Sequence, residues 1–572
     1  MAALAPAYLP RRPTETVLYR TVRENLETFL AHARETYERP LPQYVEQELR
    51  AYLRCGVFAH GFARLRCETC RHDLLVAYSC KGRGICPSCA GRRMANCAAH
   101  LVDRVVPDVP LRQYVLSLPH ELRRLAAFKQ DVLGALVKIF IDAVTAGYRA
   151  RAKREGIEGA EVGAITFLQR FGGSLNLNLH LHVAFLDGVF TRDERKQVQF
   201  HPACAPDAAE LDAIARRVHW RATAWLRRHH YIEDKPLEAR SNEMSSPGAI
   251  EACADIAMQR GVFAVHFGHD GDSHEATGGE PPKLRFAAQH EGFNLHAGVH
   301  IAAGDDTGRE RLFRYGARPS LALDRLRRLP DGRIAYRVKY ARAGRAKHRV
   351  MEPLELLARI AAILPPPRFP LVRFHGVLAP RSSWRKDVVP QPRERKPRPL
   401  AEGRRGTCDE KLPGHHAKAT GPTEHRAGSS ADGPASANTP LAKAAALAAS
   451  RPEPQQPVDG LKPPTRRLFG SDAAILLAPS ILAVAHWDRL MGGLLYAVST
   501  RLPWAQLLRR TFALDVQQCP KCAGRLRLIQ NITQPAVAQA ILERLGMPTE
   551  APTAARARDP TEADVGLDDR AE

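Results

Sequence analysis

Two Cys-x-x-Cys pairs constrain the fold of this chain more than any other feature of its sequence. They are Cys67-Glu-Thr-Cys70 and Cys86-Pro-Ser-Cys89, and a short segment separates them. Each pair can form a tight turn that aims two thiolates at one tetrahedral ion, as in zinc ribbons. We therefore expect these four cysteines to bind one structural Zn²⁺. Extra or substitute ligands are available nearby in Cys55, Cys80 and His60.

The cysteine content also suggests a compartment. Twelve cysteines in 572 residues are better explained in a reducing compartment by metal binding than by disulfides. No secretory signal is evident, and the most apolar late run, residues 473–485, is too short to cross a bilayer and contains Pro479. We therefore expect a cytoplasmic protein without membrane contact.

The charge balance favours a polyanionic partner. Lys and Arg outnumber Asp and Glu by 84 to 61, which gives a net charge of +23. Nucleic acid is the first candidate for such a basic chain, although an arginine-rich coding background would also make the surface basic.

Cationic and aromatic side chains surround the predicted zinc site. The aromatic members are Phe58, Phe62 and Tyr78. Such a mixture can clamp phosphates and stack on bases, or the charges can simply be solvated around a zinc ion that only stabilises the fold. The candidate DNA-binding residues are Arg64, Arg66, Lys81, Arg83, Arg92 and Arg93.

A second motif lies in residues 176–188, Asn-Leu-Asn-Leu-His-Leu-His-Val-Ala-Phe-Leu-Asp-Gly. Polar and apolar residues alternate with period two, so a strand would place His180 and His182 on one face, with their α-carbons roughly 7 Å apart. Two neutral imidazoles at this spacing can chelate a divalent ion and leave positions open for phosphate. The alternative is a half-buried strand with two surface histidines.

The elements around this strand predict a mixed α and β domain. A strand at residues 113–119 and one long helix at about 121–153 precede a second strand at 164–171, and the Gly172-Gly173 turn then leads into the histidine strand. If the last two strands pair, Gln169 becomes a candidate third metal ligand. Asp187 could orient a histidine or complete the ligand set.

The candidate nucleophile is Tyr315. Thr307 and Glu310 form a capping-box pair, so we expect a helix to begin at Thr307 and to end soon after Tyr315, at Gly316. Arginines around a phenol favour its ionised form and can hold a phosphate, and Arg311, Arg314 and Arg318 flank this one. The alternative is a tyrosine that only packs its ring at a helix end.

A pair of tyrosines, Tyr336 and Tyr340, has the spacing of a two-tyrosine nucleophile on a helix. The segment around them follows Pro330-Asp-Gly and is rich in β-forming residues, so a strand is the better interpretation. Tyr340 is therefore only a secondary candidate.

Taken together, these motifs resemble the rolling-circle insertion-sequence transposases, and most closely the IS91 group and its common-region relatives. The resemblance covers about residues 40–380 and also touches Cys519-Pro-Lys-Cys522. It rests on residues 67–70, 79–89, Leu116-Ser-Leu-Pro119, Asn178-Leu-His-Leu-His182, Arg314-Tyr-Gly-Ala-Arg-Pro319 and Arg373-Phe-His-Gly-Val-Leu-Ala-Pro380.

The resemblance implies an HUH endonuclease, in which two histidines bind Mg²⁺ or Mn²⁺ and a tyrosine attacks single-stranded DNA to form a 5′-phosphotyrosine link and a free 3′ hydroxyl. On this basis Tyr315 is the nucleophile, assisted by Arg314 and Arg318. Founding members carry a second tyrosine four residues earlier, where this chain has Arg311. Strand transfer with one tyrosine requires a second subunit, a reset of the same tyrosine, or attack by the free 3′ hydroxyl.

The predicted fold class is α+β, with an HUH-type antiparallel sheet flanked by helices. We expect an N-terminal arm (1–20), a zinc-binding DNA-recognition domain (21–105), the catalytic domain (106–381), a disordered basic linker (382–467), a small C-terminal domain with one CxxC (468–547) and a disordered acidic tail (548–572). A zinc ion in the C-terminal domain would need Cys408, His415, His416 or another subunit besides Cys519 and Cys522. The alternative is a reduced structural pair of cysteines without metal.

The predicted function is that of a transposase that nicks and transfers single-stranded DNA at element ends. One alternative is an HUH replication initiator or relaxase, which shares the chemistry but acts at a plasmid origin. The other is a zinc-dependent DNA-binding regulator without catalysis, in which Tyr315 and the two histidines would be structural.

Overall fold

The structure is a computed structural model that describes residues 11–232, 248–258, 286–338, 347–390, 507 and 515–558. Most of the predicted linker, from residue 391 on, and Tyr340 lie outside the described residues. Among the described helices, none is both long and apolar enough to cross a membrane.

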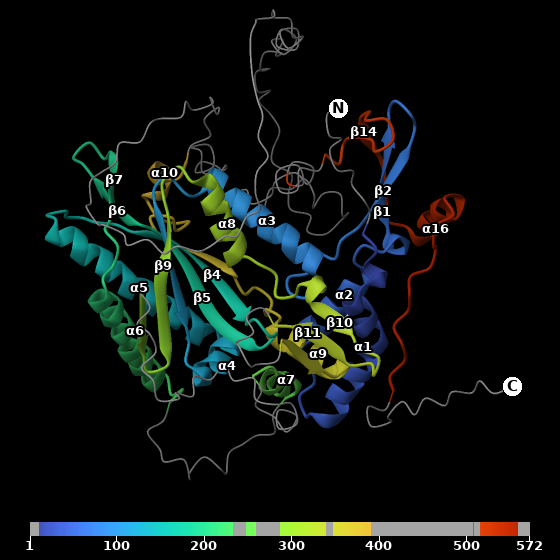
Figure 1. Cartoon of the computed structure of the whole chain (residues 1–572), viewed down its shortest axis with the longest axis horizontal. Helices are drawn as coiled ribbons and strands as arrows, with labels where there is room; N and C mark the ends of the chain where they lie inside the picture. The colour runs from blue at the N-terminus through green and yellow to red at the C-terminus, as the bar shows by residue number, and fades with distance from the viewer. Residues whose placement is uncertain are drawn as a thin grey trace, which may run out of the picture. The chain divides into compact units, whose positions relative to one another are not determined.

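A six-stranded antiparallel sheet forms the centre of the chain (Figure 1). Its strand order is β13-β4-β5-β3-β9-β8, so β5 lies in the interior between β4 and β3. The strands are β3 (Leu111–Ser117), β4 (Gly163–Phe171), β5 (Leu177–Leu186), β8 (Ala287–His290), β9 (Phe293–Ile301) and β13 (Val372–Gly376). The predicted α+β class with antiparallel sheets is confirmed.

The two faces of this sheet are covered by different helices, as the period-two pattern of β5 requires. Leu179, Leu181 and Val183 face a core formed with α5 (Gln130–Arg154) and α6 (Ala208–Arg228). Ala184 and Leu186 face the opposite core, formed with α3 (Pro87–Arg104), α8 (Asp306–Gly316) and α10 (Arg385–Val388). His180 and His182 share the face of Ala184, on the side of α3 and α8.

The predicted long helix at 121–153 is instead two helices, α4 (His120–Phe128) and α5, which are separated by Lys129 in an extended conformation. Arg170, buried on β4, donates a hydrogen bond to the carbonyl of Ala127 and lies 5.4 Å from the ring centroid of Phe128. These tertiary contacts fix the end of α4. They cannot be predicted from the local sequence, which is why a single helix was expected.

A second core lies under a small antiparallel sheet of β10 (Leu326–Arg328), β11 (Ile334–Arg337) and β12 (His348–Met351). The helices of this core are α1 (Val17–Thr36), α2 (Gln43–Arg54), α7 (Ala249–Ala257) and α9 (Pro353–Ile363). Tyr336 is fully buried on β11, so the strand interpretation of its segment is confirmed. A separate hairpin pairs β6 (Gly188–Arg192) with β7 (Val198–Pro202).

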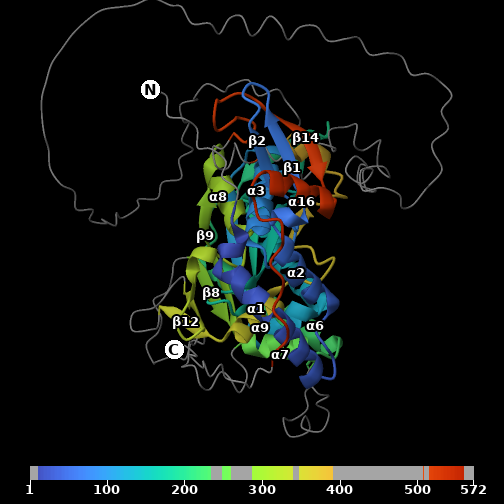
Figure 2. The same ribbon diagram turned by 90° about the vertical axis from the view of Figure 1, so that its right-hand side faces the viewer.

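A third sheet joins the two ends of the described chain. Its order is β14-β1-β2, in which β1 (Phe62–Cys67) pairs with both β2 (Asp73–Ala77) and β14 (Leu526–Ile532). Both views show β14 in red beside β1 in blue, and α16 (Pro535–Arg544) near the same sheet (Figures 1 and 2). Phe62, Leu75, Ile532, Ala538 and Leu542 form one buried cluster there.

The described part of the predicted C-terminal domain therefore has no core of its own, and those of its apolar residues that are buried pack against the N-terminal region. Two predicted boundaries also shift. Residues 382–390, assigned to the linker, contain α10 and bury Val388 and Val389. Residues 548–558 of the predicted tail lie along α1, where the amide of Ala555 donates to the carbonyl of Arg23.

Candidate active site

The two histidines of β5 are held close together on the face covered by α3 and α8. Their ring centroids are 4.9 Å apart, and the residues are 9% and 5% exposed. Burial removes water that would stabilise the charged imidazolium, so the pKa of His180 falls to about 4 and that of His182 to about 3. Both imidazoles are therefore neutral near pH 7, which is the form that binds metal.

Hydrogen bonds occupy one ring nitrogen of each histidine. His180 Nδ1 lies 2.9 Å from the carbonyl oxygen of Asn178, and His182 Nδ1 lies 3.1 Å from the Gln113 side-chain amide on β3. His182 Nε2 is buried and has no hydrogen-bond partner within the described part of the chain. A buried polar atom without a partner is costly, so this nitrogen is suited to a ligand.

Tyr315 lies in the last turn of α8, next to the histidine pair. Its ring centroid is 5.4 Å from that of His182, the two rings meet edge to face, and the tyrosine is 39% exposed. The helix ends at Gly316 as predicted. It begins at Asp306 rather than Thr307, because the carboxylate of Asp305 caps it by accepting from the amide of Gly308.

Gln169 holds the end of α8 against β4. Its Nε2 donates to the carbonyl oxygens of both Tyr315 and Gly316 at 2.9 Å, and its Oε1 accepts from Arg318 Nε at 3.1 Å. The oxygen that was expected to bind metal is therefore used by Arg318. In this geometry Gln169 positions Tyr315 and Arg318.

Arg318 lies directly beside the tyrosine. Its guanidinium carbon is 4.9 Å from the ring centroid of Tyr315 and 5.0 Å from that of Phe171. The flat guanidinium thus packs between two aromatic rings, where its charge can reach a phosphate at Tyr315. Arg314 belongs to the last turn of α8 and is half-buried.

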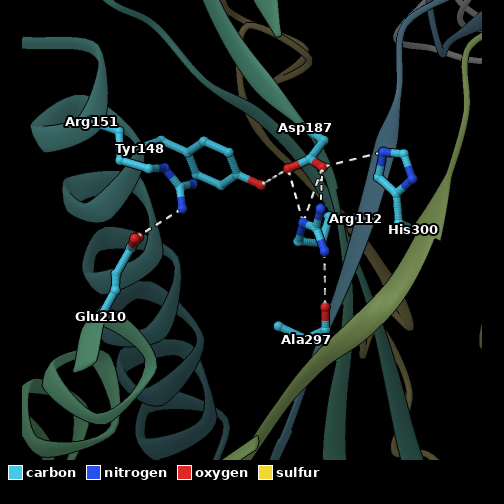
Figure 3. Close-up of polar contacts among 7 residues, drawn as sticks. All are labelled: Arg112, Tyr148, Arg151, Asp187, Glu210, Ala297 and His300. Carbon is cyan, nitrogen blue, oxygen red and sulfur yellow. Dashed lines mark hydrogen bonds and ion pairs between the residues drawn. The ribbon is translucent and has the colours of Figure 1, made fainter. Parts of the chain in front are cut away.

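Asp187 does not join the histidines. Its carboxylate accepts from Arg112 Nε at 3.0 Å and from Tyr148 Oη at 2.7 Å, and His300 Nε2 lies 3.5 Å from it (Figure 3). Tyr148 belongs to α5, so this network is on the other side of the sheet. The expectation that Asp187 orients a histidine or completes the metal site is wrong, since its carboxylate lies on the face of the sheet opposite the histidines and is bound by Arg112 and Tyr148.

Eight of the cysteines in the described part of the chain form two clusters of four, and in each cluster all four Sγ atoms lie within 4.8 Å of one another. The prediction that the two N-terminal CxxC pairs share one ion is therefore wrong. His60 belongs to neither cluster. The first cluster contains Cys55, Cys80, Cys86 and Cys89, and the second contains Cys67, Cys70, Cys519 and Cys522.

Comparison with known proteins gives three matches. Residues 163–386 match the family model of a putative transposase, and residues 22–118 match a transposase zinc-binding domain. A curated relative, the transposase for insertion sequence element IS801 of Pseudomonas savastanoi pv. phaseolicola, is 25% identical over 388 residues, which are 66% of this chain and 78% of that protein. The chain belongs to the IS91 family of transposases. No solved structure matches it.

The family identity assigns the metal of the cysteines. The zinc-binding match at 22–118 contains the whole first cluster, so this IS91-family transposase binds Zn²⁺ there. The Sγ of Cys55 lies 3.5 Å from that of Cys86 and 3.7 Å from that of Cys89, close to the roughly 3.8 Å that tetrahedral zinc with bonds of about 2.3 Å requires. Cys55 precedes both CxxC pairs, and spacing alone left it as a substitute.

A transposase binds DNA, and the predicted DNA-binding residues of this one have different surroundings. Arg64 and Arg66 on β1 both donate to the carboxylate of Asp73 on β2, which neutralises part of their charge. Lys81 and Arg92 are exposed.

The other two arginines lie closer to the six-stranded sheet. Arg83 donates to the carbonyls of Pro366 and Phe369, and Arg93 donates to the carbonyl of Lys81. Together with Gln169 and Arg318, these two side chains line a pocket that begins at α3 and reaches β4. The zinc-binding domain thus contributes positive charge to the pocket that Arg318 also lines.

Sequence reasoning missed Gln113 as a partner of His182. Gln113 stands near the start of β3, and the register pairs it with Ala184, two residues beyond His182 on β5. A neighbouring strand that is more than sixty positions away in the chain leaves no periodic signal at the histidines, so the strand order was needed to find it.

Proposed function

We propose that this transposase cleaves single-stranded DNA at the ends of its element through attack by Tyr315, and then transfers the strand in rolling-circle transposition. The observation that carries the proposal is the convergence of Tyr315, His182 and His180 from two separate elements, with ring centroids 5.4 and 4.9 Å apart. A tyrosine that packed only for stability would not need a neutral imidazole pair beside it.

The histidine pair fits a divalent cation. Both imidazoles are held neutral by burial, and His182 Nε2 lacks a hydrogen-bond partner among the described residues. His180 and His182 would hold Mg²⁺ or Mn²⁺, with waters or phosphate completing the shell. When bound, the cation would supply charge neutralisation at the scissile phosphate.

The residues of the chain perform the remaining steps. The phenol of Tyr315 loses its proton to solvent, and its oxygen forms a bond to phosphorus. The bond from phosphorus to the 3′ oxygen of the preceding nucleotide breaks, and that oxygen takes up a proton as a free hydroxyl. The 5′-phosphotyrosine retains the energy of the phosphodiester for rejoining to a new 3′ hydroxyl.

Arg318 and Gln169 organise this attack. Gln169 fixes the backbone at Tyr315 and Gly316, so the phenol approaches from a defined direction. Arg318 lies over the tyrosine ring and can pair with a phosphate oxygen. Arg83 and Arg93, in the same pocket lining as Arg318, would contact the DNA backbone next to the cleaved position.

The test is an adduct assay on single-stranded DNA that contains the end sequence of the element. Purified protein is incubated with Mg²⁺ or Mn²⁺, and a denaturing gel reports protein that carries covalent DNA. Wild type and Tyr340→Phe should form the adduct. Tyr315→Phe and the double variant His180→Ala/His182→Ala should not.

Each other outcome has a distinct meaning. An adduct that persists in Tyr315→Phe and disappears in Tyr340→Phe would move the nucleophile to Tyr340. If wild type binds the same DNA tightly with metal present but never forms an adduct, the protein is a DNA-binding regulator and the catalytic proposal fails. Cleavage restricted to a plasmid origin would identify a replication initiator or relaxase.

A further inference from the structure

The second cysteine cluster brings together residues from opposite ends of the chain. Cys67 is the last residue of β1 and Cys70 follows it, and Cys519 and Cys522 precede β14, about 450 positions later. Cys67 Sγ lies 3.5 Å from Cys522 Sγ, and Cys70 Sγ lies 3.6 Å from Cys519 Sγ. These separations are far longer than the roughly 2.05 Å of a disulfide and close to the roughly 3.8 Å between ligands of one tetrahedral zinc.

The two CxxC turns have the same backbone conformation. The residue after each second cysteine is left-handed, with φ of 61° at Arg71 and 58° at Ala523. In each turn this residue donates its amide to the carbonyl of the first cysteine, from Arg71 to Cys67 at 3.1 Å and from Ala523 to Cys519 at 3.0 Å.

A second hydrogen bond repeats as well. The amide of the first cysteine in each turn donates to the carbonyl five residues later, from Cys67 to His72 at 2.9 Å and from Cys519 to Gly524 at 2.7 Å. Two turns of the same design, which face each other with their thiols inward, form the arrangement that a tetrahedral metal requires.

Contacts around the second cluster hold the two cysteine turns close together. A Cβ on Gly524 would lie 2.5 Å from Thr69 Oγ1 and 3.1 Å from Cys67 Sγ, so only glycine fits beside the sulfur. The amide of Glu68 donates to the carbonyl of Arg525 at 3.0 Å, and the side chains of Glu68 and Arg527 form an ion pair. The two turns are thus tied together by backbone and charge as well as by sulfur.

We infer that Cys67, Cys70, Cys519 and Cys522 bind a second Zn²⁺, which joins the C-terminal segment to the N-terminal zinc-binding region. This ion completes the sheet β14-β1-β2 from two distant segments, so the C-terminal segment is a structural part of that region. The inference does not depend on the proposed chemistry at Tyr315.

The first test is the metal content of the full-length protein, purified under reducing conditions. Wild type should hold two zinc ions per chain. Cys519→Ser/Cys522→Ser and Cys67→Ser/Cys70→Ser should each hold one, and the quadruple variant should also hold one, because both pairs serve the same ion. Cys204→Ser, which alters an exposed cysteine outside both clusters, should keep two.

The second test needs no substitution in the clusters and so does not depend on the folding of variants. Cys70, Cys522 and Cys204 are all exposed, so all three thiols should react quickly with iodoacetamide if no metal is bound. In zinc-loaded wild type under reductant, mass spectrometry should find Cys204 alkylated and Cys70 and Cys522 protected. A chelator that removes the second ion should expose Cys70 and Cys522 together.

Several results would overturn the inference. One zinc ion per wild-type chain would do so, and so would two ions in Cys519→Ser/Cys522→Ser. Iron in place of the second zinc would refute the metal assignment. Alkylation of Cys70 and Cys522 at the rate of Cys204 in zinc-loaded protein would show that the thiols are not metal ligands.

Discussion

At the scale of single residues, two buried glutamines divide the support of the candidate site. The side chain of Gln113 contacts the ring of His182, whereas the side chain of Gln169 contacts the backbone carbonyl of Tyr315. Both are almost fully buried, so neither amide can exchange its protein partner for water. One glutamine therefore orients a candidate metal ligand, and the other orients the candidate nucleophile.

Replacement of Gln113 should weaken metal binding. In Gln113→Leu the ring of His182 loses its hydrogen-bond partner and its fixed orientation. Because loss of such a partner typically weakens metal binding by 10- to 100-fold, we expect the metal affinity of this variant to fall by roughly that factor. The Mn²⁺ concentration for half-maximal adduct formation should rise, and saturating metal should restore the wild-type rate. An unchanged metal requirement would contradict this role.

Replacement of Gln169 should slow adduct formation without changing the metal requirement. Gln169→Leu leaves two backbone carbonyls and Arg318 without their partner, so the phenol is misplaced and adduct formation should slow by roughly 100-fold even at saturating Mn²⁺. Rapid-quench measurements at saturating metal distinguish the two variants. If excess Mn²⁺ rescued Gln169→Leu, the glutamine would act as a metal ligand after all.

At the scale of elements, the central sheet carries the candidate site on one face and a buried polar network on the other. On the face covered by α8, the interior strand β5 presents its two histidines. On the face covered by α5, Arg112, Asp187 and Tyr148 form a buried polar network. The edge strand β13 pairs with β4, so it supports the strand that holds Gln169.

The edge strand predicts a pH dependence of stability. Burial, followed by repulsion from Arg373, lowers the pKa of His375 on β13 from 6.5 to about 4. As pH falls from 6.5 towards 4, His375 becomes protonated in the unfolded chain but stays neutral in the folded chain. The free energy of unfolding therefore decreases across this pH range and is constant below it. The loss is on the order of 3 kcal/mol.

Thermal melting of His375→Gln measures this effect. Glutamine can still bond Thr166 Oγ1, which lies 2.9 Å from His375 Nε2, but it does not titrate. The melting temperature of wild type should therefore fall more steeply between pH 6.5 and 4 than that of the variant. Parallel curves for the two proteins would show that His375 does not contribute to the slope.

At the scale of the whole molecule, the positive charge bears on DNA binding, and the chain connectivity bears on how the zinc-binding region is assembled. The net charge of +23 favours DNA before any specific contact forms. The sheet β14-β1-β2 connects segments that are more than 400 positions apart, so the zinc-binding region cannot be complete until the C-terminal segment has been synthesised.

The charge predicts a steep salt dependence of DNA binding. If about six phosphates are neutralised, raising NaCl from 50 to 200 mM should weaken binding to a single-stranded oligonucleotide by roughly 10²–10³-fold through loss of counterion release. Fluorescence anisotropy over this range gives the slope. Arg83→Gln/Arg93→Gln should reduce it, whereas an affinity independent of salt would exclude an electrostatic interface.

The sequence by itself determined what depends on neighbouring residues. Alternation along 176–188 was enough to predict a strand with both histidines on one face, and each of the two N-terminal CxxC pairs was enough to predict a tight turn suited to metal, because backbone geometry acts over a few positions. Gly316 likewise marked the end of the helix that carries Tyr315.

Only the tertiary structure decided which of these local units meet. Cys67 and Cys70 pair with Cys519 and Cys522 because β1 and β14 bury a shared apolar cluster, and that burial depends on shape rather than on distance along the chain. Gln113 reaches His182 because β3 lies beside β5. Asp187 contacts Arg112 because it lies on the opposite face of the sheet from the histidines.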